Sequence, residues 1–145
     1  MADYDIVGKR VARVDGIAKV TGAAQYTADL SMPGQLYGKI LRSPYPHARI
    51  LSIDTSQAEK LYGVRGVVTG KDFGGFRYGF MPTTRDEPPL AEDKVRFVGE
   101  EVAAVAAIDP EIAAEAIELI KVEYEPLPAI YDPEASLEEG APQLH

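Results

Sequence analysis

The segment from Val102 to Ile108 constrains the fold more than any other part of this 145-residue chain. Its sequence, VAAVAAI, contains no polar residue, so a strand built from it is apolar on both faces. Alternate side chains of a strand point to opposite sides, so such a strand belongs inside a sheet that is covered on both sides. Its small alanines allow a helix to pack close. We therefore predict a central strand over residues 102–108.

The clearest helix follows this strand directly. Asp109 and Pro110 predict its start, because aspartate accepts hydrogen bonds from the first amides and proline fits the first helical position. An apolar stripe and an acidic face follow at helical spacing. The stripe is Ile112, Ala113, Ala116, Ile117 and Ile120, and the acidic face is Glu111, Glu115 and Glu118. A shorter helix is predicted from Ser56, which forms a capping box with Glu59, to a stop at Gly63.

Short strands separated by glycine and proline account for most of the remaining chain. We expect strands at residues 36–42, 48–54, 64–69, 94–98 and 121–124, with 23–28 as a further candidate. In the predicted strand at 48–54, Leu51 and Ile53 fall on one face and Ile50 and Ser52 on the other. Residues 94–98 and 102–108 resemble a hairpin around Gly99. No strict βαβ repeat is present, so we predict an α+β domain with a mixed β-sheet and two helices.

The length predicts one domain over residues 1–145, since domains average roughly 150 residues. Within it we expect an irregular, locally basic arm at 1–20, a long loop at 70–90 and an acidic tail at 129–145. Loops as long as 70–90 are usually functional or mobile. This loop carries four aromatic residues, which we interpret as anchors that hold it on the core rather than as a binding surface. They are Phe73, Phe76, Tyr78 and Phe80.

Composition excludes several classes of function. Fifteen basic and 23 acidic residues give a net charge of −8, which argues against a general nucleic-acid binder and against charge-driven binding to anionic membranes. The chain has no cysteine, so disulfides, thiolate metal sites and cysteine-ligated iron–sulfur clusters are excluded. No apolar run approaches the roughly 20 residues of a membrane span, and no signal peptide is visible, so we expect a cytoplasmic protein.

Catalytic motifs are largely missing. The closest approach to a phosphate-binding loop, Gly66–Asp72, is one residue short and has an acid where a magnesium-binding hydroxyl belongs. Of the two histidines, His47 lies in a proline-rich turn and His145 ends the sequence, which is not a metal-site pattern. No serine lies in a GxSxG sequence. We therefore predict no catalytic, cofactor-binding or metal-ligating residue.

Four sequence blocks, taken together and in order, resemble the molybdenum-binding subunit of the xanthine dehydrogenase/aldehyde oxidase family. They are RVDGIAKVTGAAQYTAD from Arg13, LYG to HARI over 36–50, VRFVGEEVAAVA from Val95, and the segment from Ala113 to Pro128 that ends in IKVEYEPLP. Within the family, the segment Pro89–Arg96 is most similar to the large subunit of 4-hydroxybenzoyl-CoA reductase.

The resemblance implies the α/β-hammerhead fold, which is the N-terminal domain of that large subunit. It implies a parent oxidoreductase of the molybdenum hydroxylase type, with iron–sulfur clusters and FAD in companion modules. Such an enzyme hydroxylates, or reductively dehydroxylates, an aromatic or heterocyclic substrate at a molybdopterin centre. The implied partners are the remaining molybdopterin-binding domains of the same subunit and the iron–sulfur and flavin subunits.

The family's pterin-binding segments and catalytic glutamate lie downstream of the matched blocks. We therefore expect the 145 residues to be a piece of a longer subunit that binds no cofactor alone and is inactive alone. The alternative is a freestanding, non-catalytic assembly or binding subunit that docks onto a separate molybdenum protein.

Individual residues of the blocks have structural interpretations. We expect Gly16, Gly22 and Gly99 to serve turns or close backbone approach. We expect Arg13, Asp15 and Lys19 to form an ion-paired entry arm. Arg42 and His47 either make local hydrogen bonds, which we favour, or face a neighbouring cofactor domain.

Overall fold

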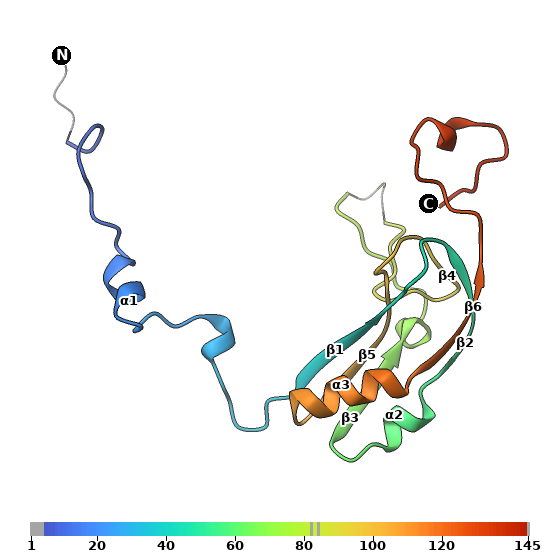
Figure 1. Cartoon of the computed structure of the whole chain (residues 1–145), viewed down its shortest axis with the longest axis horizontal. Coiled ribbons are helices and arrows are strands. Elements are labelled where there is room, and N and C mark those ends of the chain that lie inside the picture. The colour runs from blue at the N-terminus through green and yellow to red at the C-terminus, as the bar shows by residue number, and fades with distance from the viewer. Residues whose placement is uncertain (1–4, 82, 84, 145) are drawn as a thin grey trace. The chain divides into compact units, whose positions relative to one another are not determined.

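The computed structural model describes residues 5–81, 83 and 85–144, and the chain forms two compact units (Figure 1). We call Met1–Gln35 the N-terminal unit and Leu36–His145 the sheet unit. The N-terminal unit contains the helix α1 (Gly16–Val20) and a 3-10 turn at Thr27–Asp29. None of its described residues is buried.

Two sequence predictions for the N-terminal unit are wrong. The first 20 residues are not wholly irregular, because α1 forms there. The candidate strand at 23–28 is absent, since the Asp29 carboxylate accepts a hydrogen bond from the Tyr26 amide at 2.9 Å and closes the 3-10 turn instead.

The sheet unit contains two three-stranded sheets. The first has the order β1 (Tyr37–Arg42), β5 (Glu101–Ala107), β3 (Val64–Thr69), so the apolar segment is its central strand, as predicted. The second has the order β4 (Lys94–Val95), β2 (Ala48–Asp54), β6 (Lys121–Pro126). The α+β class is confirmed. However, the strands form two sheets with antiparallel pairings rather than one mixed sheet.

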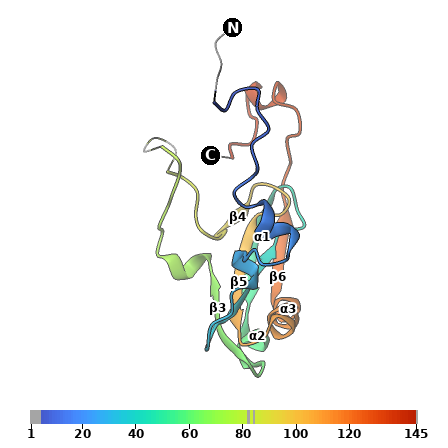
Figure 2. The same ribbon diagram turned by 90° about the vertical axis from the view of Figure 1, so that its left-hand side faces the viewer.

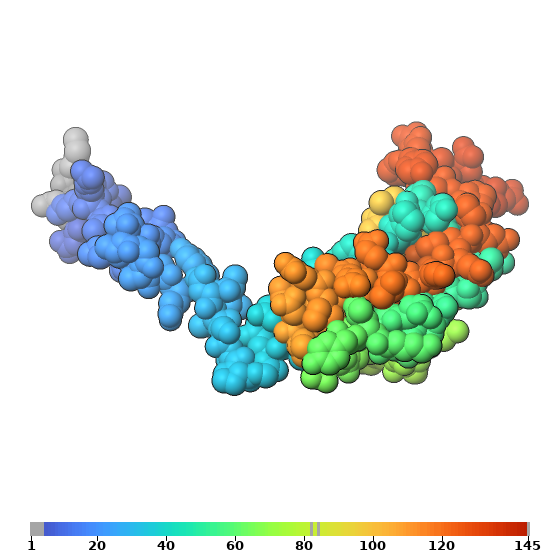
Figure 3. Space-filling model, turned by 60° about the horizontal axis from the view of Figure 1, so that its bottom comes forward, coloured from blue at the N-terminus to red at the C-terminus, as the bar shows by residue number. Residues whose placement is uncertain are grey.

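Both predicted helices cover the first sheet. Helix α2 (Ser56–Lys60) contacts β3, helix α3 (Pro110–Leu119) contacts β1 and β5, and the two helices contact each other. Figure 2 shows the two helices next to each other at the lower end of the strands. Their atoms meet in a continuous green and orange surface in the space-filling view (Figure 3). The predicted cap is confirmed, because Asp109 accepts from the amides of Glu111 and Ile112.

The core has two connected clusters. One lies between the first sheet and the helices and contains Ala58, Ala103, Val105, Ala116 and Ile120. The other lies where β5 meets the second sheet and contains Ala48, Ala91, Val95 and Val102. Ile53 and Val122 pack against both clusters, so the two sheets share one core.

Three local predictions in this unit are wrong. The hairpin of 94–98 with 102–108 does not form, because β4 has only two residues and pairs with β2. The short helix α2 follows Thr55, whose hydroxyl donates to Glu59, so the capping box at Ser56 is absent. A register shift between Ile50 and Ser52 exposes Leu51 and turns both isoleucines of β2 toward the core, which breaks the predicted alternation.

Candidate functional site

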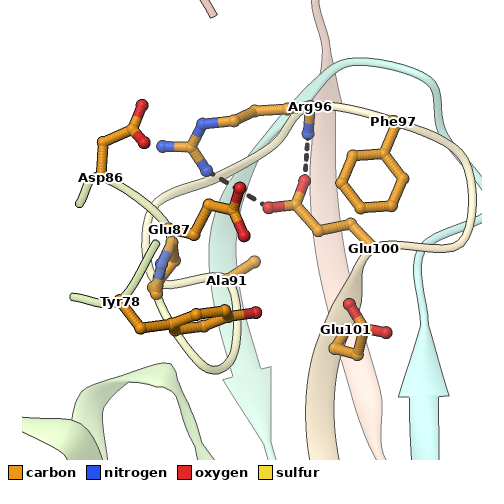
Figure 4. Close-up of a pocket in the computed structure, with 9 residues that line it drawn as sticks. Tyr78, Asp86, Glu87, Ala91, Arg96, Phe97, Glu100 and Glu101 are labelled. Atoms are coloured by element: carbon orange, nitrogen blue, oxygen red, sulfur yellow. Dashed lines mark hydrogen bonds and ion pairs between the residues drawn. The ribbon is translucent and has the colours of Figure 1, made fainter. Parts of the chain in front are cut away.

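A cavity of about 240 Å³ lies where the long loop meets the segment between β4 and β5. Its lining is Tyr78, Asp86, Glu87, Pro88, Ala91, Arg96, Phe97, Glu100 and Glu101. Four of these side chains are carboxylates and one is a guanidinium (Figure 4). Residues from two separate stretches of sequence therefore build one acidic site.

The most buried polar pair of this cavity is Arg96 with Glu100. The Arg96 backbone amide donates to the Glu100 carboxylate, and the guanidinium Nη1 lies 3.3 Å from Glu100 Oε1 (Figure 4). Their side chains are 16% and 9% exposed, so water screens this pair weakly. The Arg96 Nε also donates to the Leu144 carbonyl at 3.0 Å, so the guanidinium is already engaged.

Arg42 fixes the neighbouring turn. Its Nη1 donates to the Gly99 carbonyl at 2.7 Å and to Glu101 Oε1 at 2.5 Å. Gly99 has a φ of +91°, a conformation that favours glycine, which fits its predicted role in a turn. The predicted local hydrogen-bonding role of Arg42 is confirmed.

His47 also makes a local contact, as predicted. Its ring is buried, and Nδ1 lies 2.7 Å from the Pro128 carbonyl oxygen. Because a carbonyl can only accept, Nδ1 is the donor in this contact. The other ring nitrogen, Nε2, is buried and has no hydrogen-bond partner among the described groups. His47 therefore joins the turn before β2 to the chain that leaves β6.

In the N-terminal unit, the predicted ion pairs form. Arg13 binds Asp15 through Nε and Nη2, both at 3.0 Å, and Lys19 Nζ lies 2.6 Å from Asp15 Oδ2. Hydrogen bonds from Arg13 and then Lys19 hold the pKa of Asp15 below its usual range. Gly22 has a positive φ and Gly16 does not.

The aromatic residues of the long loop do not anchor it, contrary to the sequence prediction. Phe80 is fully exposed, Phe76 and Tyr78 are about half exposed or more, and Phe73, the least exposed of the four, is still 37% exposed. The loop is held instead by an ion pair of 2.8 Å from Arg77 to Glu92 and by an isolated antiparallel bridge between Tyr78 and Glu87. The pKa of Glu92 is lowered, chiefly by the hydrogen bond from Arg77.

The residues resembling a phosphate loop have another role. The Asp72 carboxylate accepts from both the backbone amide and the hydroxyl of Thr69, at 2.7 and 3.1 Å. An anion would meet this carboxylate first, which disfavours phosphate there. Within the described part of the chain, no group of three or more histidine, aspartate or glutamate side chains could hold a metal ion.

No helix in the described part of the chain is both long enough and apolar enough to cross a membrane.

The acidic cavity suits a cationic group better than an anionic one. Among the residues that the structure describes, its lining contains no histidine, serine or lysine, so its ionisable groups are the four carboxylates, Tyr78 and Arg96. The Arg96 guanidinium is held by Glu100 and by the backbone carbonyls of Lys94 and Leu144.

The comparisons with known proteins agree on one family. The family model described as "Aldehyde oxidase and xanthine dehydrogenase, a/b hammerhead domain" matches residues 21–128. The chain is 53% identical, over 92% of its length, to a probable xanthine dehydrogenase subunit of Bacillus subtilis. It is 42% identical, over 99% of its length, to the nicotinate dehydrogenase large molybdopterin subunit of Eubacterium barkeri.

A solved structure of CO dehydrogenase from Oligotropha carboxidovorans matches 93% of the chain, with a TM-score of 0.84 and 44% identity. In each of these three comparisons the chain spans only part of the relative: 18% of the Bacillus protein, 33% of the Eubacterium protein and 17% of the CO dehydrogenase chain.

Proposed function

Because the chain belongs to the aldehyde oxidase and xanthine dehydrogenase family, we propose that it serves as the structural hammerhead domain of a molybdopterin-binding large subunit. In this proposal residues 1–145 act as one domain, with an arm at 1–20, the loop at 70–90 and a tail at 129–145. The parent is a molybdenum hydroxylase-type oxidoreductase, and a cytoplasmic location belongs to the same proposal.

One observation carries this proposal. The family model covers residues 21–128, which include both sheets and the helices α2 and α3. The relatives match almost the whole chain, although it makes up only 17% to 33% of their length. The chain therefore forms a domain with its own core that recurs inside much longer relatives, which supports a structural role within a larger protein.

The molybdenum cofactor itself does not fit the acidic cavity. Molybdopterin carries a phosphate, which Asp86, Glu87, Glu100 and Glu101 would repel. The Arg96 guanidinium is already bound to Glu100 and to the carbonyls of Lys94 and Leu144. We therefore assign no step of the reaction to this cavity, and the cofactor belongs to other parts of the proposed subunit.

The substrate proposal is an aromatic or heterocyclic compound that is hydroxylated or reductively dehydroxylated at carbon. Relatives named for xanthine, nicotinate and nicotine support the heterocyclic class. The segment Pro89–Arg96 supports the narrower proposal of a 4-hydroxybenzoyl-CoA reductase-like parent. Partners in the proposal are the remaining molybdopterin-binding domains and the iron–sulfur and FAD subunits.

The test is to purify the natural gene product that contains this sequence from its own host through an affinity tag. Its polypeptide mass, molybdenum content and iron–sulfur absorbance are then measured. The 145-residue chain, produced separately, is the control and is expected to contain no stoichiometric molybdenum. A long polypeptide that holds molybdenum and co-purifies with iron–sulfur and flavin subunits supports the proposal.

Two other outcomes overturn it. A 15.7 kDa chain that co-purifies with a separately encoded molybdenum protein supports the alternative of a freestanding assembly subunit. A 15.7 kDa chain that itself holds stoichiometric molybdenum excludes a purely structural role. Turnover of 4-hydroxybenzoyl-CoA compared with xanthine and nicotinate then tests the substrate.

A further inference from the structure

The N-terminal unit exposes apolar side chains that it cannot bury itself. Val14 is fully exposed, and Ile17 and Val20 are 78% and 86% exposed. Val14, Ile17 and Val20 follow one another at three-residue spacing, and Ile17 and Val20 therefore lie on the same face of α1. We call these three residues the ridge. Four other apolar side chains of the unit, Ile6, Val7, Val11 and Met32, are also more than 60% exposed.

Little within the unit holds its conformation. Helix α1 has five residues, whereas isolated helices shorter than about 12 residues are marginal in water. The hydrogen bonds at its end are local, such as those from the Thr21 amide to Ile17 and from the Ala24 amide to Ala18. Its ion pairs are solvent-exposed and contribute little stability. The ridge therefore needs a surface from elsewhere to become stably ordered.

The charges beside the ridge form one small ion-paired cluster. Asp15 pairs with both Arg13 and Lys19, so this cluster carries a single net positive charge. Residues 1–35 carry four basic and four acidic residues, and the net charge of −8 therefore belongs to the sheet unit. A second copy is a poor occupant, because two strongly acidic molecules repel each other.

The length of the relatives favours one occupant. The match to the Eubacterium barkeri subunit covers 99% of this chain, so it includes the N-terminal unit, and that subunit is three times as long. Relatives therefore carry this unit together with a large amount of further polypeptide. We propose that the ridge docks into an apolar groove on the remaining part of the same large subunit, an inference that rests on the proposed function.

The experiment compares hydrogen–deuterium exchange of the purified natural gene product with that of the 145-residue chain. Peptides covering residues 9–24 are expected to exchange near the unprotected rate in the short chain and at least 100-fold more slowly in the natural product. The double variant I17D/V20D of the natural product is expected to lose this protection. Tyr62→Asp, at an apolar residue of the sheet unit that is 89% exposed, is the matched control and should retain it.

The outcomes separate this inference from the proposed function. A natural product that contains molybdenum but leaves residues 9–24 unprotected overturns the docking inference alone. A product without molybdenum overturns the proposed function. Protection that appears in the short chain and rises with its concentration indicates a second copy as the occupant and also overturns the inference. Thermal unfolding of the short chain with I17D/V20D must match wild type, which shows that the variant does not act by unfolding the sheet unit.

Discussion

The N-terminal unit and the sheet unit are built from nearly the same proportion of apolar residues. Seventeen of the 35 residues of the N-terminal unit, about 49%, are apolar, compared with 46% of the residues of the whole chain. The sheet unit nevertheless buries a continuous core, whereas no described residue of the N-terminal unit is buried. The amount of apolar side chain therefore does not decide whether a segment forms a core.

The difference lies in what each apolar segment can reach. Strand β5 has a hydrogen-bonded strand on each side and a helix within contact, so its side chains are covered from several directions. The ridge lies on a five-residue helix with local hydrogen bonds. Substitutions should consequently affect stability in the sheet unit and leave it unchanged in the N-terminal unit. Of the four experiments that follow, the first compares two sites within the sheet unit and the other three compare the two units.

The largest effect is expected from Glu100→Ala. It leaves the weakly screened Arg96 guanidinium without its carboxylate and the Arg96 amide without an acceptor, so we expect a loss of about 3 kcal/mol in the free energy of unfolding. Glu101→Ala removes the more exposed pair with Arg42 and should cost about 1 kcal/mol or less. Urea unfolding of both variants measures the difference. Equal losses would mean that burial of the pair at Glu100 has no energetic consequence.

The second experiment compares two apolar truncations. Val102 is fully buried in the central strand, so Val102→Ala should destabilise by about 2 kcal/mol. Ile17→Ala removes more side chain but from an exposed position, and should change the free energy of unfolding by less than about 0.5 kcal/mol. A large loss for Ile17→Ala would show that the two units unfold together.

The parts of the fold that could be predicted from the sequence are those that adjacent residues encode. The central strand and the helix after Asp109 were predictable because their patterns are local: an apolar run, then an acceptor and a proline. The hairpin failed because β4 pairs with β2, more than 40 residues away, and adjacent sequence does not encode that choice. The alternation in β2 failed because one extra residue at Leu51 shifts the faces.

The same division applies to the site. Local hydrogen bonding by Arg42 and His47 was predicted, but their partners lie 57 and 81 residues away in the sequence. The acidic cavity was missed, because it joins residues 78–91 to 96–101 only after folding. The run of Gly99, Glu100 and Glu101 was its available sequence pattern, and on its own it resembled a turn.

The third experiment compares the residues that begin two helices. Asp109 accepts two amide hydrogen bonds at the start of α3, so Asp109→Ala should cost about 1 kcal/mol. Asp15 precedes α1 without a capping hydrogen bond from its side chain, so Asp15→Ala should have no measurable effect on the cooperative transition. Thermal unfolding followed by circular dichroism measures both. A lower melting temperature for Asp15→Ala would contradict the independence of the N-terminal unit.

The smallest effect is a difference in the acid limb of the stability curve. Arg77 lowers the pKa of Glu92, so the folded chain holds this carboxylate ionised at a pH where the unfolded chain protonates it. The pair therefore stabilises the fold above the usual glutamate pKa of about 4.3, and this contribution is lost as the pH falls through the lowered value.

Arg77→Gln should remove a small part of the stability at pH 7 and flatten its decline below about pH 4. Arg13 lowers the pKa of Asp15 in the same direction, but Arg13→Gln should leave the acid limb unchanged, because Asp15 lies in the N-terminal unit, where no described residue is buried. Urea midpoints from about pH 3 to 7 measure both variants, and an altered acid limb for Arg13→Gln would show that the paired charges beside the ridge are coupled to the core.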